Sequence, residues 1–257
     1  MAEPMPTPAQ IEQRAEAAGT SKATMPLGRT WVLAMMAGLF IGLGAAFMVL
    51  VKSDASLGFA ASSVLGGLCF SVGLFCVLTA GAELFTGNSL MVCGLLSRRY
   101  GWARLLRSWG LVWLGNLAGS LVLVGLLLVA DFGSLNGGAV AQTAATIAAT
   151  KAGLPLGTVF GRAVLCNLLV CVAVWMGFAA TSVPGKLCCA VMPVMAFVAC
   201  GFEHCVANMA FLPYGMACAG TWDWAGLLGN LAVSTLGNLA GGVVLVGCAY
   251  WLAYRDA

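Results

Sequence analysis

The sequence predicts an all-α membrane protein with six transmembrane helices in two inverted three-helix repeats. Composition, uncharged runs of spanning length and an internal duplication support this fold class. The chain has 257 residues, of which 61% are hydrophobic and only 8% are charged, whereas ordinary soluble domains carry about 25% charged residues. So little polar surface cannot coat a water-soluble globule, which indicates that the chain folds in a membrane.

Uncharged runs long enough to cross a bilayer, which takes about 20 apolar residues, occupy most of the chain. The uninterrupted runs are 30–51, 55–82, 108–130, 163–185 and 224–254. The run 55–82 continues at 84–97 beyond Glu83, and the run 187–202 is followed by Glu203 and the only histidine, His204. These runs predict six crossings, the second and fifth broken. The expected divisions are an N-terminal segment (1–28) and a six-span domain (29–252), with repeats at about 29–130 and 157–252.

Charge outside the spans sets the expected topology. Residues 1–28 are polar and lack the apolar core of a signal peptide, so we expect an amphipathic cytosolic segment. The segment 98–107 holds four arginines and no acid, and the positive-inside rule places it in the cytoplasm. Six spans then put both termini in the cytoplasm, in a multi-pass protein of the inner (cytoplasmic) membrane.

Two pairs of motifs reveal an internal duplication. LGNLAGSLVLVG (114–125) and LGNLAGGVVLVG (236–247) agree at ten of twelve positions, 122 residues apart. GAELFTGN (81–88) and GFEHCVAN (201–208) share Gly81/Gly201, Glu83/Glu203 and Asn88/Asn208, 120 residues apart. Since each unit holds three predicted spans, the second enters the membrane from the opposite side, and matched interruptions in such repeats mark the transport path.

The chemistry of the two interruptions, 81–88 and 201–208, favours an anion as the transported species. Glycine lets the chain turn at each of them. We expect Thr86, Asn88 and Asn208 to cap the half-helices that follow. Their N-termini would then direct the positive ends of helix dipoles towards the path.

Three ionisable residues fall inside these interruptions, where charge is costly and usually functional. Because the duplication repeats Glu83 at Glu203, anchoring of the broken backbone is the favoured role, with proton or substrate handling as the alternative. His204 has no such counterpart, since Leu84 occupies its place. We therefore expect His204 on the path, as a hydrogen-bond donor or proton exchanger, rather than as a packing residue.

Other polar residues have two interpretations. Lys151, in the link 131–157, is either a solvated loop lysine or the basic group of an outer vestibule that concentrates anions. Arg162 is expected to anchor at the membrane interface. Asn167 is polar enough to line the path, whereas Asn116 and Asn238 are expected to form interhelical hydrogen bonds.

Several functional classes are excluded by residue types. The 11 cysteines form no CxxC pair, and one histidine supplies neither a zinc site nor two axial haem ligands. No basic and aromatic patch suggests nucleic acid. We expect no cofactor, no metal and no enzyme activity.

The motifs resemble those of the formate/nitrite transporter family. The similar stretches are GGLCFSVGL (66–74), GAELFTGN (81–88), NLLVCVAVWM (167–176), GFEHCVANM (201–209) and LGNLAGG (236–242). This resemblance runs from about Arg29 to Trp251. It implies an aquaporin-like protomer with its own pore, assembled as a homopentamer in the lipid membrane.

The resemblance also implies roles for particular residues. His204 would be the pore histidine, Thr86 the threonine on the mobile break, Lys151 the outer lysine and Asn167 the in-pore asparagine. The implied apolar constrictions are Phe70, Leu74, Leu84, Phe85, Val170 and Phe197.

The resemblance further implies transport of small weak-acid anions with linked protons. Formate is favoured as the commonest family substrate, whereas the ending of GAELFTGN resembles the nitrite and hydrosulfide branches. A secondary transporter with alternating access is the competing mechanism.

Overall fold

The computed structural model describes residues 4–255, so residues 1–3 of the predicted N-terminal segment lie outside it. The described residues form helices and no strand. In chain order these are α1 (Pro8–Thr24), α2 (Leu27–Lys52), α3 (Phe59–Phe70), α4 (Val72–Cys76), η1 (Val77–Gly81), η2 (Gly87–Met91), α5 (Val92–Leu96), α6 (Trp102–Val129), η3 (Phe132–Gly138), α7 (Ala139–Ala152), α8 (Leu156–Ala179), α9 (Val183–Ala199), α10 (Cys205–Ala219), α11 (Trp224–Leu239), η4 (Ala240–Cys248) and α12 (Ala249–Tyr254).

The described chain is a multi-pass helical membrane protein. Five helical stretches are long and apolar enough to cross a membrane: Leu27–Lys52, Phe59–Gly81, Trp102–Val129, Leu156–Ala179 and Trp224–Tyr254. The expected fifth span instead consists of α9 and α10, with 17 and 15 residues. Residues 205–216 of α10 are all buried, so this short helix lies inside the bundle.

The helical path is interrupted at 82–86, after η1, and at 200–204, between α9 and α10. Glycine makes each turn possible, because Gly81 and Gly201 have φ angles of +84° and +68°, a left-handed conformation that other residues adopt at a cost. Both interruptions therefore follow from sequence and allow the chain to change direction inside the bundle.

Matched glycines bring the helices together in the same way in both halves of the chain. A Cβ atom on Gly119 of α6 would lie 2.0 Å from the Met35 carbonyl oxygen of α2. A Cβ atom on Gly241 of η4 would lie 2.2 Å from the Val164 carbonyl oxygen of α8. Only glycine permits such backbone contact, which is the small-residue packing typical of membrane helices.

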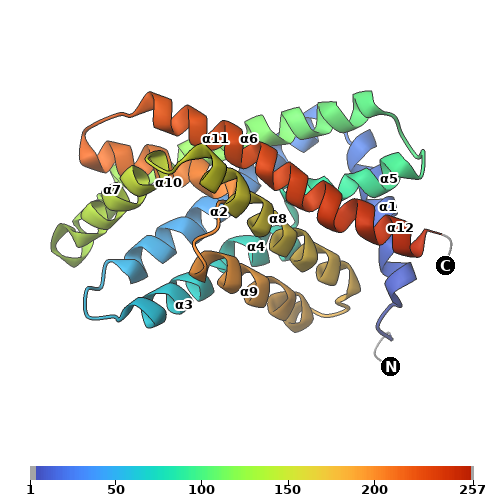
Figure 1. Ribbon diagram of the computed structural model, residues 1–257, viewed down its shortest axis with the longest axis horizontal. Helices are drawn as coiled ribbons and strands as arrows, with labels where there is room; N and C mark the ends of the chain where they lie inside the picture. The colour runs from blue at the N-terminus through green and yellow to red at the C-terminus, as the bar shows by residue number, and fades with distance from the viewer. Residues whose placement is uncertain (1–3, 256–257) are drawn as a thin grey trace.

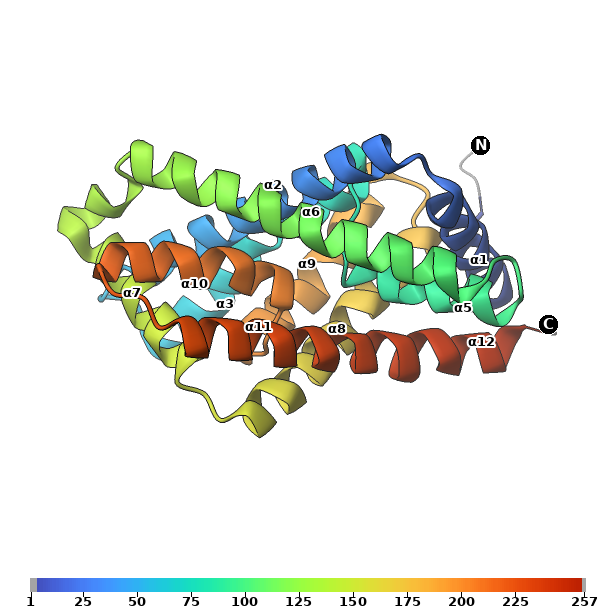
Figure 2. The same ribbon diagram turned by 90° about the horizontal axis from the view of Figure 1, so that it is seen from above.

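The link between the halves is helical rather than extended. Residues 139–152 form α7, which packs along α10. Figure 1 shows α7 at the end of the molecule opposite both termini and α1, and Figure 2 shows the same separation from above. Lys151 thus lies in the last turn of a helix, and the interpretation of it as a loop residue is wrong.

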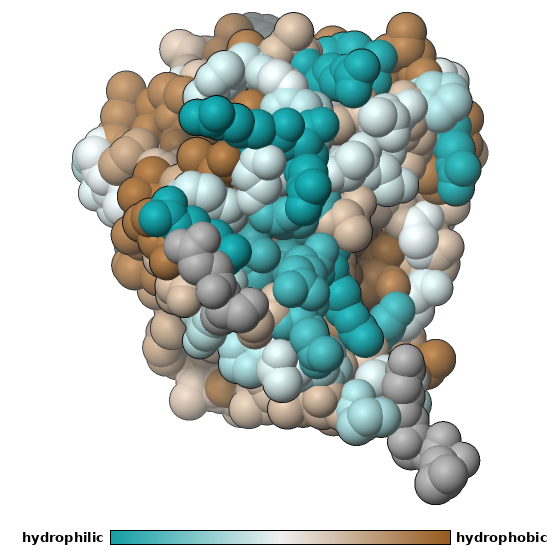
Figure 3. Space-filling view, turned by 90° about the vertical axis from the view of Figure 1, so that its right-hand side faces the viewer, coloured by the Kyte–Doolittle hydropathy of each residue, from teal (hydrophilic) through white to brown (hydrophobic). Residues whose placement is uncertain are grey.

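The helix α1 closes the opposite end of the bundle. Its N-terminus is fixed by a capping box between Thr7 and Gln10. Along its length, Arg14 donates to the Phe178 carbonyl at 2.8 Å, and the Glu16 carboxylate accepts from Arg99 at 3.2 Å and from Ser97. Figure 3 shows hydrophilic side chains gathered at the centre of this end, with apolar ones around them.

Candidate functional site

The two interruptions meet at the centre of the bundle. Thr86 Oγ1, from the first, lies 2.9 Å from His204 Nε2, from the second. Both side chains are buried. The backbone is held alike on both sides, since the Glu83 N–H donates to the Leu33 carbonyl and the Glu203 N–H to the Arg162 carbonyl.

His204 caps the N-terminus of α10. Its Nδ1 accepts a hydrogen bond from the Ala207 backbone N–H at 3.1 Å. Because Nδ1 is the acceptor, the ring proton belongs on Nε2, which then donates to Thr86 Oγ1. A second proton on Nδ1 would break the cap and place positive charge at a helix N-terminus, which is unfavourable. The arrangement fits a neutral imidazole that donates.

The prediction that Thr86, Asn88 and Asn208 cap the half-helices is wrong. Thr86 occupies the position before η2, but its side chain makes no capping hydrogen bond. Asn88 and Asn208 lie within helices and donate to the carboxylates of Glu83 and Glu203, at 2.9 and 2.7 Å. Each amide therefore orients a buried acid.

A narrow apolar gap adjoins His204 and has no room for a water molecule. Its wall contains five of the six residues expected at a constriction. They are Phe70, Leu74, Leu84, Val170 and Phe197. Phe85 is buried in the same core but does not line the gap. Ile41 and Val194 also line it, and nothing distinguishes them in sequence from other apolar helix residues.

A charged cluster lies on the α7 side of this gap. Lys151 Nζ donates to Glu203 Oε1 at 2.8 Å, and its ammonium lies 5.5 Å from the centre of the Phe211 ring. The other carboxylate oxygen of Glu203 accepts from Asn208 at 2.7 Å and from Asn230 at 3.3 Å. The buried acid is thus paired and hydrogen-bonded, as a buried charge must be.

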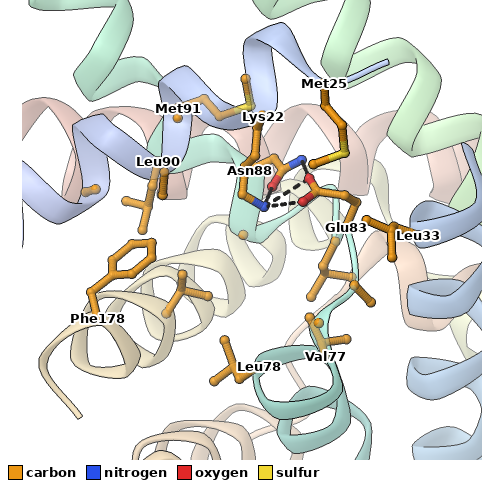
Figure 4. Close-up of a pocket in the computed structure, with 18 of the residues that line it drawn as sticks. Lys22, Met25, Leu33, Val77, Leu78, Glu83, Asn88, Leu90, Met91 and Phe178 are labelled. Atoms are coloured by element: carbon orange, nitrogen blue, oxygen red, sulfur yellow. Dashed lines mark hydrogen bonds and ion pairs between the residues drawn. The ribbon is translucent and has the colours of Figure 1, made fainter. Parts of the chain in front are cut away.

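A matching cluster lies on the α1 side (Figure 4). Lys22 Nζ donates to both carboxylate oxygens of Glu83 at 2.9 Å and to Asn88 Oδ1 at 2.8 Å. Figure 4 shows these three groups converging in the cavity from α1, the interruption and η2. In both clusters, a glutamate carboxylate of the interruption is therefore bound by one lysine and one asparagine side chain.

Lys22 was not identified as a site residue from the sequence, although a signal for it exists. KATMPLG (22–28) and KAGLPLG (151–157) share five of seven residues at an offset of 129. The same offset relates Leu33 to Arg162, whose carbonyls hold the two interruptions. A repeat search extended to the segments before the first span of each half pairs Lys22 with Lys151.

Asn116 and Asn238 hold the interruptions through equivalent hydrogen bonds. Asn116 accepts from the Phe85 N–H at 2.9 Å and donates to the Glu83 carbonyl at 2.8 Å. Asn238 accepts from the Cys205 N–H at 2.8 Å and donates to the Glu203 carbonyl at 2.9 Å. Backbone groups freed by unwinding are satisfied in this way, as membrane depth requires.

Asn167 lies beside the first interruption rather than on a cavity wall. Its amide nitrogen donates to the Asn238 carbonyl at 2.6 Å and to Ser89 Oγ at 3.1 Å. It also donates to the Thr86 carbonyl at 3.3 Å. Asn167 thus fixes the backbone of Thr86 and does not itself face either of the cavities described next.

Two cavities open on opposite sides of the apolar gap. The α1-side cavity has a volume of about 450 Å³, and its wall includes Lys22, Arg29 and Glu83. The α7-side cavity has a volume of about 230 Å³, and its wall includes Lys52, Lys151, Arg162, Glu203 and His204. Arg162, expected as an interface anchor, therefore faces this cavity. Each cavity contains more cations than acids, which concentrates anions.

Within residues 4–255, no three His, Cys, Asp or Glu side chains are grouped to hold a metal ion. The polar groups of the site are amides, hydroxyls, ammonium and guanidinium groups, one imidazole and the two paired carboxylates. These groups offer hydrogen bonds and charge to a small ion, with an apolar barrier between the two cavities.

Comparisons with known proteins match this arrangement. Residues 9–252 match the family described as formate/nitrite transporter. The chain is 38% identical to a probable formate transporter of Methanothermobacter thermautotrophicus, covering 96% of this chain and 97% of the relative. It is 35% identical to the formate channel FocA of Escherichia coli strain K12, covering 96% and 94%.

Among solved structures, the chain is similar to a pentameric formate channel with formate bound. The TM-score is 0.81 at 34% sequence identity, covering 90% of this chain and 98% of that one. The family consists of channels and transporters, which are not enzymes. With the family match over nearly the whole sequence, the chain belongs to the formate/nitrite transporter family.

Proposed function

We propose that this protein passes small monovalent weak-acid anions, most readily formate, across the membrane in a proton-linked manner. Nitrite and hydrosulfide are the alternative substrates of the same site. One observation carries the proposal: the Thr86–His204 hydrogen bond lies at an apolar gap between two cavities, and the wall of each cavity holds more cations than acids.

The apolar gap favours the neutral acid over the anion. Transferring an unpaired carboxylate into such surroundings costs far more than transferring an uncharged molecule. Lys151 or Lys22 first raises the local anion concentration. Falling polarity towards the gap then favours uptake of a proton from cavity water, and the neutral acid crosses.

Thr86 and His204 supply hydrogen bonds at the crossing. Because His204 Nε2 donates to Thr86, the Thr86 hydroxyl proton is free to bond to a substrate oxygen. This arrangement can orient the acid without changing the protonation of the histidine. His204 therefore acts as a donor, and the proton that crosses belongs to the substrate.

The oligomeric state and the membrane topology can be proposed from the solved relative and from the charge distribution of the sequence. We propose a homopentamer with one pore in each protomer, since the solved relative is a pentameric formate channel. Residues 29–252 would form the six-span domain as two inverted repeats. Both termini and α1 would lie in the cytoplasm, next to the four arginines of 98–107, so the α7-side cavity would open outwards.

Uptake by proteoliposomes tests this function. Formate, nitrite and hydrosulfide are offered separately with and without an inwardly directed proton gradient. We expect gradient-driven uptake for the wild type, lowered about tenfold or more by His204→Ala and by Thr86→Val, because each removes a donor from the crossing. Thr30→Val is the matched control, since among the described residues the Thr30 hydroxyl bonds only to the nearby Pro26 carbonyl.

Each result decides a different point. Wild-type protein that passes none of the three anions rejects the function. Equal uptake by the wild type and both site variants, with unchanged pH dependence, would show that the histidine only supports the fold. The anion with the highest gradient-driven rate is the assigned substrate.

A further inference from the structure

The α7-side cavity contains two cations, Lys52 and Arg162, that no acid of the described residues neutralises. Lys52 ends α2 and Arg162 lies in the second turn of α8, and both side chains are half-buried in the wall of the cavity. Within residues 4–255, neither side chain has an ion-pair or hydrogen-bond partner. A half-buried charge without a counterion carries a desolvation cost. This cost suggests that a bound anionic ligand acts as the counterion.

The second half of the chain needs the backbone of Arg162 but not its guanidinium. The Arg162 carbonyl accepts the Glu203 N–H, and the Leu33 carbonyl accepts the Glu83 N–H at the matched place in the first half. Leucine therefore suffices for this position in the repeat. At this matched position, the guanidinium is present only in the second half of the chain.

The two cavities also differ in how many N–H donors of their lysine side chains are already hydrogen-bonded to the protein. The Lys22 ammonium has three donors, and three protein oxygens accept from it. Lys151 donates to a single oxygen of Glu203. Asn208 Oδ1, buried in the wall of the α7-side cavity, also has no hydrogen-bond partner within the described residues. Arg29 in the wall of the α1-side cavity is exposed, so the free hydrogen-bonding capacity of buried and half-buried groups is concentrated on the α7 side.

We propose that Arg162 and Lys52 form an anion-binding site in the α7-side cavity that prefers planar anions with two oxygen atoms. The guanidinium fork can donate two parallel hydrogen bonds to a carboxylate or to nitrite. Hydrosulfide has one acceptor atom, so two hydrogen bonds from the guanidinium would have to converge on it and would lose the parallel geometry. This site rests on the proposed function and adds selectivity to it before the anion reaches Lys151 and His204.

Oriented membrane vesicles test this site. Initial uptake rates of formate, nitrite and hydrosulfide are measured against concentration, at fixed ionic strength, in right-side-out and inverted vesicles. In right-side-out vesicles we expect Arg162→Leu to raise the half-saturating concentration of formate and nitrite about tenfold. For hydrosulfide we expect a rise of about threefold or less, which reflects lost charge alone.

Two further variants separate charge from shape. Arg162→Lys keeps the charge but loses the fork, so hydrosulfide should behave as in the wild type while formate and nitrite remain impaired. Lys52→Gln should raise all three half-saturating concentrations by a similar factor. Arg104→Leu is the control, because Arg104 is exposed on α6 at the α1 end of the molecule.

The outcomes are distinguishable. A wild type that transports none of the anions rejects the proposed function. A transporting wild type whose Arg162→Leu half-saturating concentrations are unchanged overturns the site, as does an equal rise for hydrosulfide or an equal rise in both vesicle orientations. An effect confined to inverted vesicles supports the site and reverses the assigned topology.

Discussion

His204 is constrained by both of its ring nitrogens. Nδ1 is used to cap α10 and Nε2 to reach Thr86. A proton exchanger would need one of them to change its role during each crossing, and the cap would be lost when it did. At the scale of one residue, the structure therefore favours a fixed donor.

Replacement by asparagine tests this interpretation. Asparagine is among the best N-cap residues, and its amide can still donate a hydrogen bond. We expect His204→Asn to retain uptake within about fivefold of the wild type and to keep the same pH dependence, unlike His204→Ala. Uptake that becomes independent of the proton gradient in His204→Asn would instead identify the histidine as the proton exchanger.

At the scale of elements, α1 carries a pH-sensitive contact. Burial against the rest of the protein, and then the charge and hydrogen bond of Glu16, raise the pKa of Glu12 to about 7, with Arg99 opposing the shift. Between the ordinary pKa of Glu12, 4.5, and its raised value of about 7, docked α1 therefore binds more protons than undocked α1. Its attachment is strongest below about pH 4.5 and weakens as the pH rises through about 7.

Hydrogen exchange measures this attachment. After correction for intrinsic rates, we expect amide protection across residues 8–24 to fall by about tenfold between pH 6 and pH 8. Glu12→Gln should keep the pH 6 protection at pH 8, because the amide has no proton to lose. Asp54→Asn, an exposed acid in the 53–58 link, should behave as the wild type. Protection that rises with pH contradicts the assignment.

These elements also show what sequence can and cannot provide. Glycine, an acid and an amide at a repeated spacing predicted interruptions at 81–88 and 201–208, because unwinding a buried helix requires those groups locally. The role of Lys22 depends on the docking of α1 against a distant interruption, as shown by its bonds to Glu83. The helical link α7 carries no spanning run, so hydropathy alone left it as a loop.

Within the site, too, some residues could be identified from the sequence, whereas the roles of others depend on tertiary packing. The apolar wall residues were accessible through a family resemblance, since Phe70 and Phe197 differ from other buried aromatics only in position. The capping role of His204 depends on the backbone direction at the second interruption. Arg162 shares a cavity wall with Phe197 and Val198 of α9, a tertiary neighbourhood that a hydropathy pattern does not specify.

At the scale of the whole molecule, the gap between the cavities determines which species crosses. A path without room for water carries no hydration shell for an ion, so net movement of charge is opposed. If the neutral acid crosses, transport is electrically silent. The pH difference across the membrane then sets the final distribution of the anion.

Equilibrium accumulation in sealed proteoliposomes decides between neutral and charged passage. With the interior one pH unit more alkaline, we expect total formate to accumulate about tenfold inside, because one pH unit corresponds to a tenfold change in the ratio of acid to anion. A potassium diffusion potential imposed with valinomycin at equal pH should produce no accumulation. His204→Ala should slow the approach to this ratio without changing it, since a passive path alters rates and not equilibria. Accumulation that follows the membrane potential would mean that the bare anion crosses, and the apolar gap would then have to open wide enough to admit its water.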